Sequence, residues 1–106
     1  MNVVVLITCA NCKEAKKVSR ALVANHLAAC VNTVKAIESM FWWQKKIDTA
    51  KEALLIVKSK KQLMNKIIKT VQANHSYSVP EIIALPIVSG NKDYLNWLND
   101  SLRQPL

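Results

Sequence analysis

Apolar and polar positions alternate along the chain with two different periods, and four segments show the pattern of strands. Residues 2–8 contain an unbroken apolar run, which is typical of a strand buried on both faces. Residues 28–43 form a long extended stretch of partial alternation, and residues 47–58 return along it as a second such strand. Residues 82–88 are apolar and rich in β-branched side chains, which predicts a buried fourth strand.

The segments that follow the first and third of these strands have apolar residues at helical spacing. Asn11 and Glu14 form a capping box, which predicts a helix that begins there and ends near residues 25–27. Ser59 and Gln62 form a second capping box ahead of a second helix. The apolar positions of that second helix recur at helical spacing and are expected to be buried; they are Leu63, Met64, Ile67, Ile68 and Val71.

A final helix is predicted over residues 91–102, and Pro105 is expected to end the structure. The resulting order is strand, helix, strand, strand, helix, strand and one extra helix. This order is the α+β, ferredoxin-like βαββαβ sandwich with a C-terminal helix. Pro86 agrees with it, because the last strand of this topology lies at a sheet edge, where proline is tolerated. We expect a single domain over residues 1–106.

Composition adds an expectation about assembly. Of the 106 residues, 51% are hydrophobic and 21% are charged, which is a high apolar share for a chain of 11.9 kDa. Some apolar surface is therefore expected to be buried against other copies of the chain. The stretch 28–43 supports this expectation, because it is roughly twice the usual strand length and its aromatic tip needs a partner to cover it.

The net charge of +8 would attract nucleic acid, anionic lipid or small anions, but the lysines and arginines are scattered as on solvated faces. Nucleic-acid binding is not expected, because Gly90 is the only glycine and the glycine-rich aromatic strand motif of RNA-binding sheets is absent. No segment reaches the roughly 18 to 20 apolar residues of a membrane span, and we expect no secretion signal. Three cysteines are then expected to be free thiols in a cytoplasmic protein.

Four segments resemble a known family in residues and in order. They are Leu27-Ala28-Ala29-Cys30-Val31-Asn32, Ser39 with Trp42-Trp43, the block His75-x-Tyr77-x-Val79-Pro80-Glu81-Ile82-Ile83-Ala84-Leu85-Pro86-Ile87, and Gly90-x-x-x-Tyr94-Leu95-x-Trp97-Leu98. In these segments the chain resembles the CutA family of small divalent-cation tolerance proteins. The resemblance implies a ferredoxin-like protomer in a tight cytoplasmic homotrimer, much as in the PII signalling proteins.

The resemblance also implies a link to heavy-metal tolerance and the binding of copper or a similar ion. It implies no established enzymatic reaction, so no catalytic residues are expected. By motif match it places Cys30, His75, Tyr77 and Glu81 in a cleft between subunits. The chain departs from the family pattern at Lys45, because the turn after the tryptophans commonly contains glycine.

Cys9 and Cys12 form a Cys-x-x-Cys pair at a strand end and a helix start. A helix N-terminus lowers a thiol pKa, and two thiolates suit Cu(I), or Zn(II) if further ligands come from elsewhere. The arrangement also resembles the copper-chaperone motif. The alternative is that Cys9 is a small buried strand-end residue and that Cys12 is an incidental residue of the first helical turn.

His75 and Glu81 offer an imidazole and a carboxylate, which suit Cu(II) or Zn(II). They lie on an extended segment, so they meet only if the segment bends or if they face each other from different subunits. Alternatively, His75 caps the preceding helix and Glu81 pairs with a lysine. Cys30 at a strand start is commonly a packed small hydrophobe, although the family resemblance makes it a candidate ligand.

Lys58, Tyr77, Trp43 and Trp97 are the candidates for an intersubunit cleft. The function we expect is tolerance of metal ions through a homotrimer that binds copper or another divalent transition metal such as zinc. The alternative is a PII-like trimer that senses a small anionic ligand in its clefts, with Lys58 and the basic net charge attracting the anion. The tryptophans also have a simpler reading as core or interface residues.

Overall fold

The strands and helices expected from the sequence are present in the computed structural model, which describes residues 1–103. In chain order they are β1 (Asn2–Cys9), α1 (Cys12–Ala24), β2 (Cys30–Trp43), β3 (Lys46–Lys60), the short 3-10 helix η1 (Lys61–Leu63), α2 (Met64–Asn74), β4 (Ile82–Pro86) and α3 (Lys92–Ser101). Pro105, predicted to end the structure, lies outside the described residues. Within residues 1–103, none of the helices has the length and hydropathy needed to cross a membrane.

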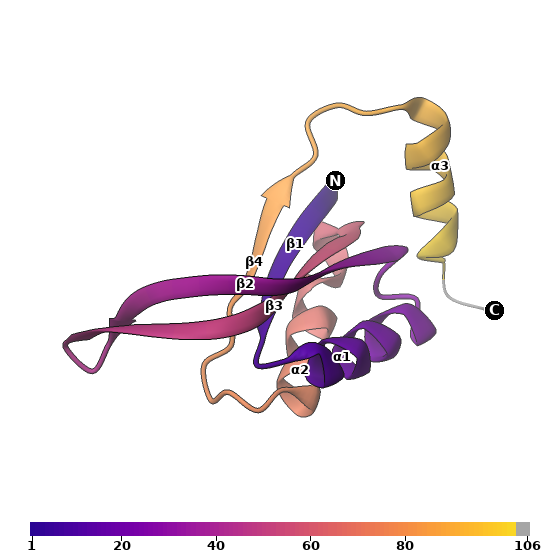
Figure 1. Ribbon diagram of the computed structural model, residues 1–106. Coiled ribbons are helices and arrows are strands. Elements are labelled where there is room, and N and C mark those ends of the chain that lie inside the picture. The colour runs from indigo at the N-terminus through magenta and orange to yellow at the C-terminus, as the bar shows by residue number, and fades with distance from the viewer. Residues whose placement is uncertain (104–106) are drawn as a thin grey trace.

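The four strands form one antiparallel sheet in the order β2-β3-β1-β4, and α1 and α2 pack against one of its faces (Figure 1). This confirms the ferredoxin-like α+β arrangement that the element order predicts. β4 lies at a sheet edge, where Pro86 is opposite Val3. α3 lies near the N-terminal end of β1, and the side chain of Asn2 donates to that of Asn99 at 2.8 Å.

The core lies between the sheet and the helices. Alternate residues of β1 point at the helices and are at most 3% exposed, whereas the residues between them point to the opposite face. The main core residues are Val3, Val5 and Ile7 of β1, Ala15, Val18 and Leu22 of α1, Leu55 and Val57 of β3, Ile67 and Val71 of α2, and Leu98 of α3. Burying one such side chain contributes roughly 1.5–3 kcal/mol to the free energy of unfolding. The packing of these residues therefore holds both helices on the sheet.

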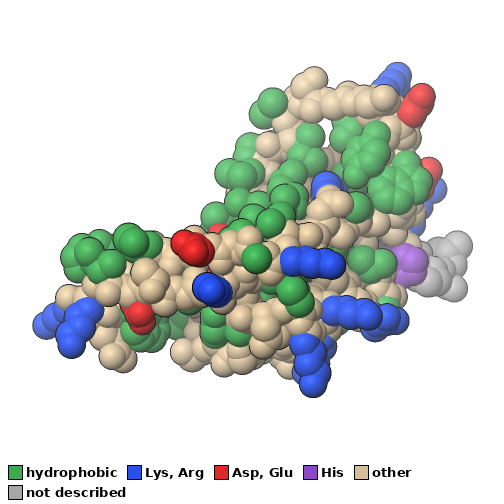
Figure 2. All heavy atoms as spheres, viewed as in Figure 1, with side chains coloured by type: hydrophobic (Ala, Val, Ile, Leu, Met, Phe, Trp, Pro, Cys, Tyr) green, Lys and Arg blue, Asp and Glu red, His purple; other side chains and the backbone are tan. Residues whose placement is uncertain are grey.

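The face of the sheet away from α1 and α2, here called the open face, is also apolar. Ile56 of β3, Leu6 of β1 and Ile83 of β4 are neighbours across it, and Leu85 lies on the same side of β4. Figure 2 shows hydrophobic side chains gathered over these strands. The prediction of a buried β4 is wrong for the single chain, because Ile83 and Leu85 are each 50% exposed and Val88 lies beyond the strand. The helices α1 and α2 cover one face of the sheet, so the other face of β4 is left open in the single chain.

β2 and β3 extend beyond the rest of the sheet as a two-stranded arm (Figure 1). Between Val34 and Ile37, three steps along β2 are opposite two steps along β3, from Leu54 to Glu52. The extra residue is a β-bulge, which bends the strand pair and increases its twist. Beside the bulge, Glu52 and the adjacent Ala53 of β3 are both buried, although neighbouring residues of a strand point to opposite faces.

The arm ends in a two-residue turn that forms without glycine. Gln44 and Lys45 adopt positive φ angles of 51° and 66°, in the left-handed region that side chains disfavour. Lys45→Gly is therefore expected to raise the free energy of unfolding by about 0.5–1 kcal/mol, to be measured by thermal unfolding at fixed protein concentration. Lys46→Gly is the matched control and should destabilise the protein, because Lys46 is already a strand residue. Equal effects at both positions would contradict the account.

The second predicted capping box is wrong. The side chain of Ser59 is fully buried, and its hydroxyl donates to the carbonyl oxygen of Leu27 at 2.6 Å. β3 continues to Lys60, which is opposite Asn2 at the start of β1, so Ser59 is still a core-facing strand residue. The chain then passes through η1, whose start carries no side-chain cap, before α2 begins.

Candidate metal centre

The end of β1, the start of α1 and the segment after α2 meet at one end of the sheet. The predicted cap by Asn11 is confirmed, because its side chain accepts from the backbone N–H of Glu14 at 2.8 Å, whereas the return bond of the predicted capping box goes to Ala10 and not to Asn11. The Glu14 carboxylate reaches back and accepts from the backbone N–H of Ala10 at 2.8 Å. Its other oxygen accepts from the backbone N–H of Ser76 at 2.6 Å, so Glu14 joins three segments.

His75 is enclosed beside this carboxylate, with a side chain that is 0% exposed. Its Nδ1 accepts from the backbone N–H of Tyr77 at 3.0 Å, so Nε2 carries the ring proton. Nε2 donates to the carbonyl oxygen of Thr8 at 2.7 Å and lies 3.7 Å from the Glu14 carboxylate. His75 directly follows α2, and the hydrogen bond from its ring to Thr8 connects the segment after α2 to the end of β1.

These contacts bring together three groups that ligate metals. The Cys9 thiol, the Glu14 carboxylate and the His75 imidazole lie within 4.8 Å of one another. A thiol, a carboxylate and an imidazole are the ligand types of zinc and copper sites, so the donor set fits such an ion. To bind through Nε2, His75 would have to release its proton and the bond to Thr8, and Cys9 would have to become a thiolate.

The electrostatics of the cluster favour a neutral thiol and a charged carboxylate. Burial, followed by repulsion from Glu14 and Glu52, raises the pKa of Cys9 to about 12. Burial also tends to raise the pKa of Glu14, but hydrogen bonds from Ala10 and Ser76 and the nearby His75 outweigh it and hold that pKa below its ordinary value. Metal binding at Cys9 would therefore release a proton and would strengthen as the pH rises.

The burial of Cys9 predicts a large difference in thiol reactivity. Cys9 is 0% exposed, and with a pKa of about 12 roughly one thiol in ten thousand is ionised at pH 8. In metal-free protein, N-ethylmaleimide is expected to modify the exposed Cys12 at least about 1,000-fold faster than Cys9, as followed by peptide mass mapping. Urea-unfolded protein is the control, in which both thiols should react. Similar rates in the folded protein would contradict the buried position of Cys9.

The other predicted ligands lie elsewhere. Cys12 is outside the cluster, and its thiol donates to the carbonyl oxygen of Lys35 at the bulge, at 3.4 Å. Glu81 is exposed and also outside the cluster, and it lines the pocket described below. Cys9 and His75 are thus the two sequence candidates that the fold brings together. Glu14 was predicted only as a cap, although a capping carboxylate that points back toward the strand end was the available signal.

Cys30 has a different set of neighbours. The Nζ of Lys58 lies 3.9 Å from its Sγ and also donates to the Asn32 side chain. Tyr94 of α3 is close enough that burial and then Cys30 raise its pKa, and its ring lies 5.5 Å from that of Trp97. Two predicted cleft residues, Lys58 and Trp97, therefore belong to the end of the sheet at which β2 begins.

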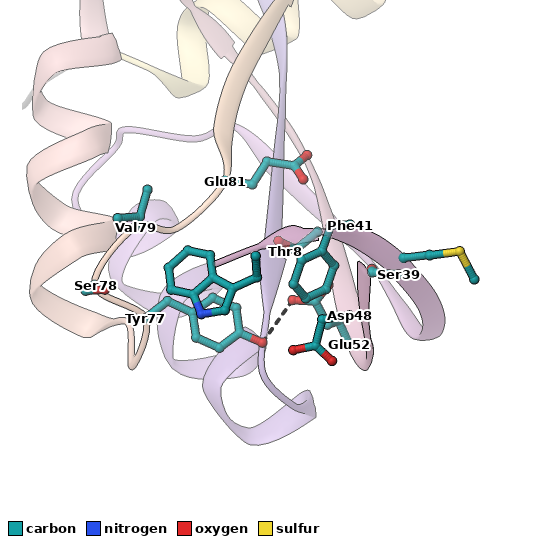
Figure 3. A pocket seen from close by; sticks show the side chains of 11 residues that line it. Thr8, Ser39, Phe41, Asp48, Glu52, Tyr77, Ser78, Val79 and Glu81 are labelled. Atoms are coloured by element: carbon teal, nitrogen blue, oxygen red, sulfur yellow. Dashed lines mark hydrogen bonds between the residues drawn. The ribbon is translucent and has the colours of Figure 1, made fainter. Parts of the chain in front are cut away.

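The other two cleft candidates, Trp43 and Tyr77, line a pocket of about 700 Å³ in the bend of the arm (Figure 3). Its wall consists of Thr8, Ser39, Met40, Phe41, Trp43, Asp48, Glu52, Tyr77, Ser78, Val79 and Glu81. Neither Lys58 nor any other lysine or arginine is among these residues. The pocket of the single chain therefore offers no charge that would attract the anionic ligand of the alternative hypothesis.

The fold and the cluster define a small ferredoxin-like protein in which side chains of metal-ligating types meet at one end of the sheet. A family model described as CutA1 divalent ion tolerance protein matches residues 3–101. The chain belongs to this family.

Individual relatives agree. The chain is 45% identical over 103 residues to the chloroplastic protein CutA 1 of Oryza sativa, covering 97% of this chain and 58% of the rice protein. The structure of the divalent cation tolerance protein from Thermus thermophilus matches with a TM-score of 0.94 and 44% identity, over 95% of this chain and 98% of that one. The periplasmic divalent cation tolerance protein CutA of Archaeoglobus fulgidus matches with a TM-score of 0.94 and 37% identity, over 97% and 100%. The chain thus spans little more than half of the rice protein but nearly all of the two prokaryotic ones.

Proposed function

We propose that this chain is a single-domain, cytoplasmic homotrimer that binds copper or another divalent transition-metal ion such as zinc and so contributes to metal tolerance. The proposal assigns it no enzymatic reaction. The observation that carries the metal assignment is the cluster of Cys9, Glu14 and His75, which offers three ligand types within 4.8 Å. A reducing cytoplasm suits the three free cysteines.

The assembly is supported by the surface of the single chain. The open face carries Ile83 and Leu85, each half exposed, beside the partly buried Leu6 and Ile56. Soluble monomers rarely leave a continuous apolar face of a sheet in water. The arm supports the same conclusion, because its tip exposes Trp42 at 72% and adjacent apolar side chains that another copy would cover.

The test is native mass spectrometry of the reduced protein with and without one equivalent of copper per chain, combined with a competition titration against a chelator of known affinity. A trimer that takes up three ions is the expected result. Cys9→Ala and His75→Gln should each weaken binding by at least about 100-fold while the trimer persists.

Cys12→Ala is the matched control, because Cys12 is exposed and outside the cluster. It should leave the affinity unchanged. An affinity that falls only with Cys12→Ala would place the ion elsewhere. A trimer that takes up no copper, and no zinc when the titration is repeated with zinc, would remove metal binding from the proposal.

A further inference from the structure

The pocket in the bend of the arm contains a buried carboxylate that the metal cluster does not include. Glu52 is 8% exposed, although glutamates are rarely so enclosed without a charged partner. The Tyr77 hydroxyl donates to its Oε2 at 2.9 Å, and among residues 1–103 no lysine, arginine or histidine forms an ion pair with it. In a chain with fifteen lysines and arginines, this buried negative charge lacks a cation.

Aromatic rings line the same pocket as this carboxylate. Figure 3 shows the Tyr77 hydroxyl directed at Glu52, with Phe41 and Asp48 alongside, and Trp43 contributes to the same wall. Aromatic faces attract cations through their quadrupoles, and a carboxylate among them adds a full opposite charge.

The wall of the pocket combines acidic side chains with aromatic and aliphatic ones. Three carboxylates line it, from Asp48, Glu52 and Glu81, and no basic residue does. They do not form a metal-ligating group, because the three-ligand cluster found among the described residues is that of Cys9, Glu14 and His75. A volume of about 700 Å³ with aromatic and aliphatic walls is also far larger than a bare ion requires.

We propose that this pocket binds an organic cation, an ammonium or guanidinium group on an apolar stem, with Glu52 as its counter-ion and the rings of Phe41, Trp43 and Tyr77 around the stem. This pocket adjoins the proposed metal centre, because the rings of Tyr77 and His75 lie 4.8 Å apart, but none of its lining residues belongs to the cluster of Cys9, Glu14 and His75. The same chemistry has two sources: a small free amine, or a lysine or arginine side chain of a second copy of this chain.

The test uses the assembled protein and calorimetric titration with n-butylammonium, n-butylguanidinium and, as a neutral probe of the same shape, n-butanol. A cation should bind at least about 10-fold more tightly than n-butanol. Glu52→Gln should abolish this preference, whereas Glu38→Gln, which removes the same charge from an exposed position on the arm, should leave it intact. If Glu52→Gln does not fold, Trp43→Leu at a half-exposed position should weaken cation binding without affecting n-butanol.

Sedimentation of the same variants over a range of concentrations separates the two sources. If a second copy supplies the cation, the free amines will not bind the wild-type assembly, and Glu52→Gln or Trp43→Leu will weaken assembly at least about 10-fold while Glu38→Gln will not. The proposal is overturned if n-butanol binds as well as the cations. It is also overturned if the pocket variants change neither cation binding nor assembly.

Discussion

Ile83→Glu is expected to convert the assembled protein into a folded monomer. Ile83 is opposite Leu6 on the open face and 50% exposed in the single chain, so the change leaves the core of the protomer intact. In an assembly that covers this face, each copy would lose the burial of one isoleucine and gain a charge without a partner, at several kcal/mol per copy. Light scattering after gel filtration should show the mass of one chain at concentrations where the proposed wild-type trimer would give the mass of three.

Val23→Glu is the matched control for this prediction. Val23 is 44% exposed and lies on α1, on the opposite side of the sheet from Ile83. Introducing the same charge there should leave the mass of the assembly unchanged. An assembled Ile83→Glu variant would show that the open face is not the interface, and loss of assembly in both variants would point to a non-specific effect of charge.

The parts of the fold that depend on local pattern could be predicted from the sequence. The apolar run of β1, the Asn11–Glu14 cap and the edge position signalled by Pro86 each follow from a few neighbouring residues. The failures have a non-local cause. Ser59 fits the pattern of a cap, but pairing with β1 keeps it in a strand, and the expected burial of β4 depended on how many faces of the sheet the chain itself covers.

The candidate site was predictable only in its residue types. Cys9 and His75 are separated by 66 positions, so their meeting depends on how the segment after α2 returns to the end of β1. The bulge that accompanies the burial of Glu52 has no glycine to mark it. Local spacing suggested the pair Cys9 and Cys12 instead, whereas the fold buries one thiol and exposes the other.

Glu14→Ala is expected to lower the free energy of unfolding of the metal-free protein by about 3 kcal/mol. The change removes two hydrogen bonds from backbone N–H groups to a carboxylate, those of Ala10 and Ser76, and takes away the negative neighbour of His75. It leaves the partly buried N–H of Ala10 without an acceptor, which costs more than that bond alone contributes, whereas water can reach the exposed N–H of Ser76. Chemical unfolding at fixed protein concentration, with a chelator present, measures the difference. Glu38→Ala, at an exposed position on β2, should change it by less than about 0.5 kcal/mol.

The same loss should depend on pH in a defined direction. Because the pKa of Glu14 is lower in the folded than in the unfolded chain, its contribution to stability is complete above the ordinary glutamate pKa of about 4.3. The contribution disappears as the pH falls through the lower, folded value, because both states are then protonated. The wild type and Glu14→Ala should therefore differ fully at pH 7 and converge in acid. A difference that stays constant down to pH 3 would show that the side chain acts through packing and not through its charge.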